Sequence, residues 1–390
     1  MKVFKLAKRV LYKPKKHINE NSKIIVFGEW FGNRCCDNCL YFANYVAETT
    51  SEFELYWIAN ESCNHERLNP SIKVLLRDSE DANQIINQAR YIFVNQGLID
   101  ITSDKFFFPK NAYLINFWHG VAWKKIGLDA CRGFFMRAYY KKLLKHNGTD
   151  YYLSTSKEFT RILKKSYCVK DRMIIESGYP RNSLFCKQEE AKKIKTDFCK
   201  KNNIPADSII VSYLPTFRDT ASANVNQEYS VQNPLFKEYL KSKKIYFINK
   251  SHYVNEQKQS DSASNDQYFL NSESLNASEI MAISNILITD YSSCFFDYLV
   301  LDRPIIHYLY DYDFYAHKDR GLYYEQKDVC CGDVSYNLEE LIKAIEMNLD
   351  NPSKDKDLRA LRRSIFMEYE SSETNAQIYK WLLTLDGHHR

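Results

Sequence analysis

The chain alternates short apolar runs with segments of helical pattern, and this alternation limits the folds that it can adopt. In its first half the apolar runs, rich in β-branched and aromatic residues, lie at 23–27, 53–58, around Leu75, 91–94, 113–117, 151–154 and 173–175. Helical patterns at 39–50 and 82–90 separate several of them. Short apolar runs that alternate with helices are typical of a parallel, doubly wound α/β sheet.

The second half repeats this rhythm. Its apolar runs lie at 208–213, 244–249, 286–289 and 304–308, and its helical patterns at 191–202, 278–283, 294–301, 338–347 and 358–369. We expect Ser278 to cap the helix that it begins. A chain of 390 residues exceeds the usual length of one domain. The sequence therefore predicts an α/β protein with two Rossmann-like domains that face a cleft and bind ligands at the carboxyl ends of their strands.

The two halves join near residues 186–200. We predict a basic segment at 1–22, an N-terminal domain at 23–187 and a C-terminal domain at 188–390. The last helix is a candidate to pack back on the N-terminal domain. The sequence contains no Gly-x-Gly-x-x-Gly, so a nucleotide is not held by a dinucleotide-binding fingerprint.

Charge and cysteine content narrow the class of function. The formal net charge is +5, with a run of basic residues at the N-terminus, and nucleic-acid binding usually needs a broader surplus. The eleven cysteines include adjacent pairs and follow no secretory leader, which indicates reduced thiols and a cytoplasmic location. No apolar run approaches the roughly 20 residues that span a bilayer.

Two patterns raise the question of a metal. Cys35, Cys36 and Cys39 are closely spaced, but no second ligand pair with zinc-site spacing follows them. Asp311 and Asp313 have the Asp-x-Asp spacing of metal-dependent sugar-nucleotide enzymes, but they lie among aromatic residues. We therefore predict no metal site.

The first candidate site is Trp118-His119-Gly120, followed by Lys124. His119 ends an apolar run, and Gly120 lets the backbone turn closely beside a ligand. The pKa of an imidazole lies near working pH, so His119 is suited to act as a general base toward an acceptor hydroxyl. The alternative is a packed histidine at the end of a strand.

Two further segments have groups that suit a phosphate. Lys250-Ser-His252 follows another apolar run, and a lysine and a histidine there can contact a phosphate; the alternative is a solvated loop. Thr289-Asp290-Tyr-Ser292-Ser293 lies between a strand and a helix. Hydroxyls and free N–H groups at a helix N-terminus form a phosphate cradle, although ordinary capping by serine explains the same pattern.

Weaker signals come from arginines that follow turns. Arg181 and Asn182 end a Gly-Tyr-Pro-Arg-Asn turn, Arg218 lies in a Pro-Thr-Phe-Arg-Asp segment, and Arg320 precedes a glycine. Each of these arginines can pair with an anion, but an arginine after a turn is usually only solvated.

Taken together, the motifs resemble those of the CDP-glycerol glycerophosphotransferase family, which comprises teichoic acid primases and polymerases. The matching segments are 118–120 with 124–127, 178–182, 215–219, 286–293, 296–297, 302–304, 310–311 and 320–321. They follow the family order over roughly residues 110–325, and the block at 286–293 is long enough to be specific.

The resemblance implies a GT-B-like fold whose C-terminal domain binds CDP-glycerol. It implies that His119 is the base toward the acceptor and that His252 stabilises the transferring phosphate or the leaving CMP. The implied donor contacts are Arg218, Lys250, Thr289, Asp290, Ser292, Ser293 and Arg320. The implied residues on the acceptor side are Gly120, Lys124, Arg181 and Asn182.

The implied reaction transfers glycerol phosphate from CDP-glycerol to a hydroxyl of a lipid-linked or polymeric glycan and releases CMP, in the synthesis of teichoic acid or a capsule-type polymer. No cofactor is obligatory, because arginine, histidine and helix dipoles can supply the charge that in-line phosphoryl transfer needs. The enzyme is expected at the cytoplasmic face of the membrane, held peripherally.

Some residues depart from the family pattern. The usual Arg-x-His-Pro is Lys250-Ser-His252-Tyr253, and the usual Thr-Pro after Trp-His-Gly is Val121-Ala122. A lysine offers charge but no bidentate fork. Ribitol phosphate or another alditol phosphate therefore remains an alternative, as do a GT-B glycosyltransferase that uses nucleotide sugars and a non-catalytic membrane scaffold. The acceptor and the oligomeric state stay open.

Two segments carry basic and apolar residues together. Residues 1–22 suit either an amphipathic surface anchor or a solvated tail. Residues 131–145 combine aromatic residues with Arg137, Lys141, Lys142 and Lys145, which suits a helix that lies on anionic lipid. The alternative for 131–145 is an amphipathic core helix with a solvated basic face.

Overall fold

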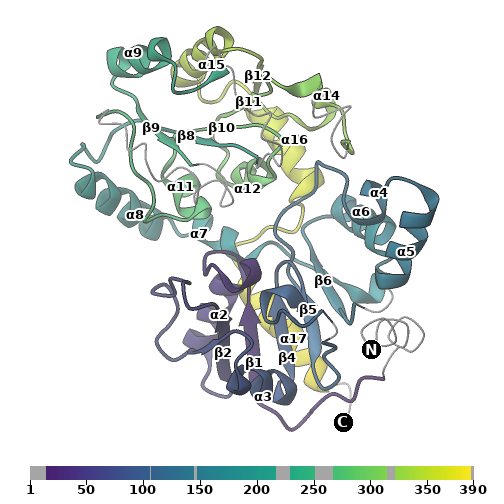
Figure 1. Cartoon of the computed structure of the whole chain (residues 1–390). Coiled ribbons are helices and arrows are strands. Elements are labelled where there is room, and N and C mark those ends of the chain that lie inside the picture. Colours follow the sequence, from purple (N-terminus) through teal and green to yellow (C-terminus); the bar gives the residue numbers. More distant parts are fainter. Residues whose placement is uncertain are drawn as a thin grey trace. The chain divides into compact units, whose positions relative to one another are not determined.

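The computed structural model describes residues 15–105, 107–144, 147–216, 229–250, 267–313 and 321–387. They divide into two compact units (Figure 1). Unit 1 contains the described residues of Met1–His119, Ile126–Ser183 and Glu368–Arg390, and unit 2 those of Gly120–Lys125 and Leu184–Met367. Relative to the predicted boundaries, the short segment 120–125 lies with unit 2 and the C-terminal segment lies with unit 1.

Unit 1 is built on a parallel sheet of seven strands in the order β3-β2-β1-β4-β5-β6-β7. The strands are β1 (Ile24–Gly28), β2 (Glu54–Ala59), β3 (Lys73–Leu76), β4 (Tyr91–Val94), β5 (Tyr113–Asn116), β6 (Tyr151–Ser154) and β7 (Ile174–Glu176). The first six strands follow the order typical of the Rossmann fold. All four residues of the central strand β4 are buried, as expected where helices cover both faces of a parallel sheet.

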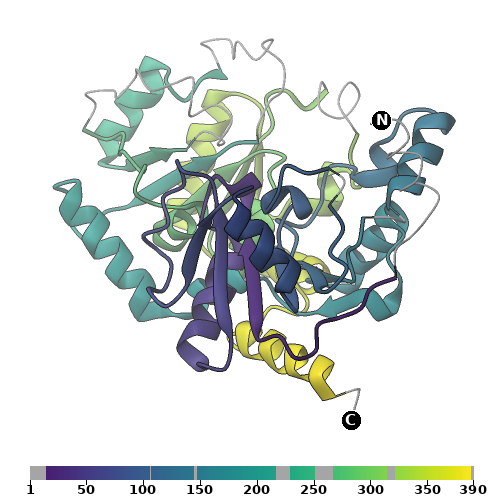
Figure 2. The same cartoon turned by 60° about the horizontal axis from the view of Figure 1, so that its bottom comes forward.

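The helices of unit 1 are α2 (Asn38–Thr49), α3 (Glu80–Gln88), α4 (Gly127–Ala130), α5 (Phe134–Leu144), α6 (Lys157–Tyr167) and α17 (Thr374–Gly387). Ser79 and Ser156 cap α3 and α6 through their side-chain oxygens, as short polar residues commonly do. Helix α17, from the end of the chain, packs on this unit through the ring pairs Tyr45–Tyr379 and Tyr151–Trp381. Figure 2 shows α17 in yellow beside the strands of unit 1.

Unit 2 has a parallel sheet of five strands in the order β12-β11-β10-β8-β9. The strands are β8 (Ile210–Leu214), β9 (Tyr246–Asn249), β10 (Ile286–Thr289), β11 (Ile305–Tyr308) and β12 (Asp333–Ser335). The helices are α7 (Ser183–Cys186, at the boundary between the units), α8 (Gln188–Lys201), α9 (Pro234–Lys243), α11 (Ala277–Ile283), α12 (Cys294–Tyr298), α14 (Gln326–Val329), α15 (Leu338–Asp350) and α16 (Lys356–Phe366).

The predicted cap of α11 is wrong. The N-cap is Asn276, which forms a reciprocal capping box with Glu279, while Ser278 lies buried within the first turn. The side chain of Asn276 accepts a hydrogen bond from the amide of Glu279, and the side chain of Glu279 accepts one from the amide of Asn276. A serine at 278 lies inside the helix and cannot accept from both of these amides.

The segment 120–125 is held in unit 2 by a short antiparallel pairing with residues 321–323. Lys124 pairs with Leu322, and the amide of Lys125 donates to the carbonyl of Gly321 at 3.0 Å. The indole of Trp123 donates to the carbonyl of Tyr324 at 2.9 Å. Through these hydrogen bonds, a segment from the first half of the chain forms part of unit 2.

Candidate functional site

His119 lies just beyond the carboxyl end of β5, on a strained turn. Its imidazole is exposed, stacks on the ring of Trp118 with 5.1 Å between centroids, and lies 6.4 Å from the ring of Trp30. Trp118 has a φ of 63°, which is costly for a bulky residue. Strain of this kind persists only where the surroundings enforce it, and it is concentrated at functional sites.

The surroundings that enforce the Trp118 turn are two asparagines. The side chain of Asn116 accepts a hydrogen bond from the amide of Trp118 at 2.8 Å. Asn38, at the start of α2, donates from its side-chain nitrogen to the carbonyl of Trp118 at 3.0 Å. Both polar groups of the Trp118 backbone are therefore held by buried side chains, and the position of His119 follows from them.

A second strained turn follows β1. Trp30 and Phe31 have φ angles of 48° and 59°. The side chain of Gln96 accepts from the amide of Trp30, and that of Asp100 accepts from the amide of Phe31, both at 2.9 Å. The indole of Trp30 donates to Asp37 at 3.0 Å. The two indoles next to His119 thus both come from strained turns at the carboxyl edge of the sheet.

Between these turns lies a group of buried carboxyls at the switch point of the sheet, where β1 pairs with both β2 and β4. Glu29 accepts from the amides of Cys36 and Asp37 and from the side chain of Asn95. Burial, and then the neighbouring Asp37, raise the pKa of Glu29 well above its usual range. Switch points are where open α/β sheets bind ligands.

Asp100 is the second buried carboxyl of this group. Its Oδ2 accepts from the amides of Asn95 at 2.9 Å and Gln96 at 2.7 Å. Burial raises the pKa of Asp100 to about 7, although its backbone donors act in the opposite direction. Asp100 therefore fixes the loop after β4 as well as the turn at Phe31.

Arg181 and Asn182, predicted on the acceptor side, are both buried in unit 1. The anion beside Arg181 is Asp37, at 2.6 Å, and the guanidinium also lies over the ring of Tyr179. Asn182 donates to Glu370 at 2.8 Å. A Cβ at Gly178 would collide with the Glu370 carboxylate, which explains the glycine in this turn. Contact with an acceptor stays a prediction for both residues.

The predicted phosphate cradle in unit 2 lies at the switch point of the second sheet, where β8 separates β9 from β10. Asp290 is fully buried, and its Oδ1 accepts from the amide of Thr216 at 2.7 Å. The hydroxyl of Thr289 is also buried and donates to the carbonyl of Leu214 at 2.7 Å. These two residues tie together the loops that follow neighbouring strands.

Ser292 and Ser293 are half-buried and directly precede α12. Ser293 is at the N-cap but makes no capping bond through its side chain, whereas Ser292 accepts from the amide of Cys294 at 3.5 Å. Burial raises the pKa of the Cys294 thiol to about 11, which keeps it neutral. This loop thus places two hydroxyls and a neutral thiol at a helix start, with the buried carboxyls of Asp290 and Asp297 nearby. Phosphate binding there stays a prediction.

Gly120 and Lys124 lie in unit 2 with the segment 120–125. Gly120 has a φ of 151°, which favours glycine. Lys250 follows β9, and its ammonium donates to the carbonyls of Leu275 at 2.6 Å and Ser272 at 3.3 Å. Lys250 therefore ties β9 to the loop before α11, and its contact with a phosphate stays a prediction.

Three predicted site residues lie outside the described residues: His252, Arg218 and Arg320. Asp311 accepts from the hydroxyl of Tyr291 at 3.1 Å. Within the described part of the chain, no group of three or more histidine, cysteine or acidic side chains is arranged to hold a metal ion.

Sequence reasoning missed the residues around His119 in unit 1, namely Glu29, Trp30, Asp37, Asn38, Asn95 and Asp100. The sequence pattern could have identified two of them, because Glu29 and Asn95 are polar residues that directly follow the apolar runs of β1 and β4. A polar residue at the end of an apolar run is also the pattern that identified His119. Which of these strands lie side by side depends on the strand order, and periodicity alone does not give that order.

Two Rossmann-like units, each with polar side chains at the carboxyl ends of its parallel strands, define a GT-B-like α/β fold. The chain belongs to the CDP-glycerol:poly(glycerophosphate) glycerophosphotransferase family, whose profile it matches over residues 10–384. It is therefore a transferase enzyme, and its family transfers glycerol phosphate from CDP-glycerol in teichoic acid synthesis.

Two relatives match over nearly their whole length. A teichoic acid poly(glycerol phosphate) polymerase of Bacillus spizizenii is 28% identical over 376 residues, 93% of this chain and 92% of the relative. A teichoic acid glycerol-phosphate transferase of Staphylococcus aureus is 26% identical over 389 residues, 96% of this chain and 97% of the relative. The solved structure of the wall teichoic acid polymerase TagF is 21% identical with a TM-score of 0.77, covering 98% of this chain and 93% of that one, which shows a shared fold.

Proposed function

We propose that this enzyme transfers glycerol phosphate from CDP-glycerol to a hydroxyl of a lipid-linked or polymeric glycan, with His119 as the general base. The observation that carries the proposal is the exposed imidazole of His119 on the strained Trp118 turn, in contact with the indoles of Trp118 and Trp30. A base must be presented to solvent and held in one orientation. Asn38 and Asn116 hydrogen-bond the backbone of Trp118 and so fix the turn that presents His119.

In the proposed step the acceptor hydroxyl gives its proton to His119 while its oxygen attacks the phosphorus of the glycerol phosphate group. The bond from this phosphorus to the bridging oxygen of CDP-glycerol breaks, and CMP leaves with the bonding electrons. His252 and Arg320 stabilise the charge that spreads over the phosphates, and Ser292 and Ser293 hold the pyrophosphate. Fixed cationic and N–H groups are what such a transition state requires.

The test measures CMP release from CDP-glycerol with the intact chain and an acceptor glycan. His119→Ala and His252→Ala should each lower the rate by at least about a hundredfold, because a positioned acid or base contributes about 10²–10⁴. The matched control is His65→Ala, since His65 is an exposed histidine of unit 1. A near-normal rate in His119→Ala would remove that residue from the mechanism.

The choice of alditol is tested on the same assay. Val121, Lys250 and Tyr253 differ from the residues usual in the family. Because these differences leave the alditol open, the assay compares CDP-glycerol with CDP-ribitol as donors. We propose glycerol as the preferred alditol, with CMP release faster from CDP-glycerol. Release of UDP from UDP-sugars, without CMP release from either CDP donor, would instead identify a glycosyltransferase.

We further propose that α5 holds the enzyme on the cytoplasmic face of the membrane. Phe134 and Phe135 are 80% and 86% exposed, and Met136 and Tyr139 are exposed beside Lys141. No residue of α5 is buried, so the helix is not a core helix. Apolar side chains bordered by cations suit anionic lipid. Within the described residues, no helix is long and apolar enough to cross a membrane.

A further inference from the structure

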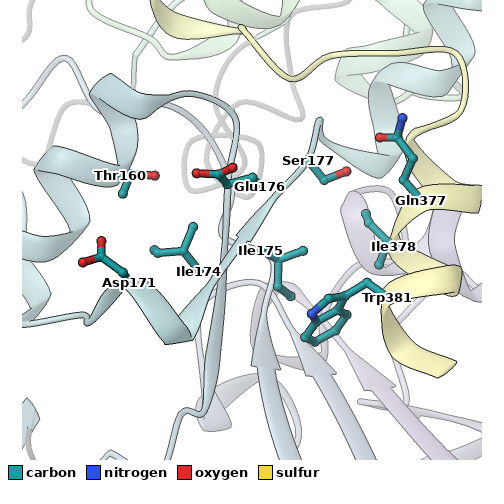
Figure 3. Close-up of a pocket in the computed structure, with 9 residues that line it drawn as sticks. All are labelled: Thr160, Asp171, Ile174, Ile175, Glu176, Ser177, Gln377, Ile378 and Trp381. Atoms are coloured by element: carbon teal, nitrogen blue, oxygen red, sulfur yellow. The ribbon is translucent and has the colours of Figure 1, made fainter. Parts of the chain in front are cut away.

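A cavity of about 250 Å³ lies in unit 1 at the open edge of the seven-stranded sheet. Strand β7, which among the described strands pairs only with β6, lines it with residues 174–176, and Ser177 lines it directly after the strand. Helices α6 and α17 flank the strand. In Figure 3 Thr160 and Asp171 lie on one side of β7, and Ile378 and Trp381 lie on the other. The cavity is somewhat smaller than the roughly 300–1,000 Å³ of pockets for drug-sized ligands, so it suits one small ring.

The hydroxyl of Ser177 is the feature that points to a ligand. Ser177 is 2% exposed, and among the described residues its Oγ has no hydrogen-bond partner. In Figure 3 this oxygen points toward α17, where Gln377 lies. A buried hydroxyl without a partner costs free energy, and such groups are rare in folded proteins. A ligand hydroxyl in the cavity would satisfy it.

The rest of the lining combines one aromatic ring with carboxylate and amide groups. The indole of Trp381 is held edge-on by Tyr151 at 4.9 Å, so its orientation is set before a ligand arrives. The carboxylates of Glu176 and Asp171 accept hydrogen bonds, and the amide of Gln377 both donates and accepts. A rigid indole offers a large apolar contact. A sugar ring has a matching apolar C–H face and a rim of hydroxyls.

The charge around the cavity favours a neutral ligand. The ammonium of Lys164 lies 2.7 Å from Asp171. The ammonium of Lys157 pairs with Glu368 at 2.8 Å, and the hydrogen bond and charge of Glu368 are the main reasons why the pKa of Lys157 is raised, with a smaller effect from Glu176. The charge of Asp171 is therefore balanced by Lys164, and both carboxylates can accept hydrogen bonds from ligand hydroxyls. A quaternary ammonium usually binds within a cage of several aromatic rings, whereas Trp381 is the one aromatic side chain among the described residues of the lining.

An extended peptide fits the edge of the sheet less well. Strand addition uses a row of main-chain groups along an exposed edge, and β7 has only three residues, Ile174–Glu176. Short edge strands are a common means of preventing such pairing. From these observations we infer that the cavity at β7 binds one neutral sugar unit.

The place of the cavity suggests which sugar this is. β5, which leads to His119, and β7 are separated by β6 alone, so their axes are about 10 Å apart. Glu176 and Ser177 lie at the carboxyl end of β7, the same edge of the sheet at which His119 follows β5. On the proposed function, the sugar belongs to the acceptor glycan and lies about one or two units from the reacting hydroxyl.

The test is binding by the intact chain, without donor, of methyl glucoside and of the methyl glycoside of N-acetylglucosamine, measured by saturation-transfer NMR and calorimetry. At least one glycoside should bind saturably. Ser177→Ala and Glu176→Gln should each weaken that binding about three- to tenfold, the value of one hydrogen bond. Ser177→Ala removes a hydroxyl without a partner, so the melting temperature should not fall.

The matched controls are Ser364→Ala and Glu373→Gln, which change exposed residues outside the cavity and should leave binding unchanged. The inference is overturned if neither glycoside binds, if choline or an alanine tripeptide binds instead, or if the cavity variants bind like the controls. The binding test contains no CDP-glycerol, so its outcome does not depend on catalysis. Absence of CMP release would contradict the proposed function without changing the measured binding of the glycosides. If transfer occurs, Ser177→Ala should raise the KM for a sugar-bearing acceptor and leave kcat unchanged.

Discussion

The side chain of Asn38 donates a hydrogen bond to the main-chain carbonyl of Trp118 at 3.0 Å. Asn38 begins α2 and Trp118 follows β5, so the bond joins parts of unit 1 that are 80 residues apart in the chain. The same asparagine accepts from the amide of Arg181 at 3.3 Å. One buried side chain therefore connects the turn that presents His119 with the turn that contains Arg181.

Asn38→Ala should lower kcat for CMP release about five- to tenfold and leave the KM for CDP-glycerol nearly unchanged. The variant removes the hydrogen bond to the carbonyl of Trp118, so the strained turn next to His119 is held less firmly. The expected loss in rate corresponds to the free energy of about one hydrogen bond. Steady-state kinetics with both substrates measures the effect. Asn44→Ala is the control, because Asn44 lies on the same helix and also bonds a main-chain carbonyl, that of Arg67. An equal loss in both variants would mean that the effect is general destabilisation.

Arg181→Met should lower the free energy of unfolding by about 3–5 kcal/mol, because it leaves the buried Asp37 carboxylate without its cation. In the double variant Arg181→Met/Asp37→Asn the cost should be smaller than the sum of the two single costs. Urea unfolding gives the three values. Lys192→Met breaks the exposed pair with Glu189 and should cost less than about 1 kcal/mol. A similar small cost for Arg181→Met would contradict the role assigned to the buried pair.

The buried imidazole of His307 should make the protein less stable in acid. Burial lowers the pKa of His307 to about 3, while an unfolded histidine titrates near 6.5. Between these values the unfolded chain binds more protons at His307, so the free energy of unfolding falls as the pH falls. Over two pH units the loss is about 2–3 kcal/mol.

Urea unfolding between pH 4.5 and 7.5 checks this slope in the parent chain and in His307→Gln, which should have a smaller loss in acid. The glutamine keeps an acceptor for the amide of Cys331. Asp100 contributes in the opposite direction, because its raised pKa of about 7 makes stability fall as the pH rises from about 4 to 7. The comparison is therefore made between variants. His65→Gln, at an exposed histidine, should keep the parent slope, and an equal slope in His307→Gln would refute the assignment.

The double variant Phe134→Ser/Phe135→Ser should reduce partition onto anionic lipid vesicles by at least about tenfold, since burying one phenylalanine contributes about 1.5–3 kcal/mol. Vesicle sedimentation measures the partition, and binding to zwitterionic vesicles should be weaker in every variant. Leu235→Ser changes another exposed apolar residue, 71% exposed on α9 of unit 2, and should leave the partition unchanged. Unaltered binding by the double variant would exclude α5 as the contact.

Much of the fold could be predicted because each short apolar run carries its own signal. Every apolar run that we identified forms a strand, with ends shifted by at most a few residues. Strand β12 was not predicted, because it has three residues and begins with Asp333. Helix α6 was missed although its apolar residues Phe159, Ile162 and Leu163 lie on one buried face. The exact start of a helix depends on which side chain caps it, as Asn276 caps α11. The sequence pattern alone does not show which of several polar residues forms the capping hydrogen bond.

For the candidate site, the sequence by itself predicted His119 and the hydroxyls of Ser292 and Ser293, because these polar residues lie in the segments that follow apolar runs and belong to the motifs of the family. Only the tertiary structure showed that Arg181 pairs with Asp37 and that Lys250 bonds main-chain carbonyls. It also brought Glu29, Asn95 and Asp100 together at a switch point. The reason is that local pattern determines strands and the residues that follow them, whereas strand order and long-range packing decide which of those residues meet.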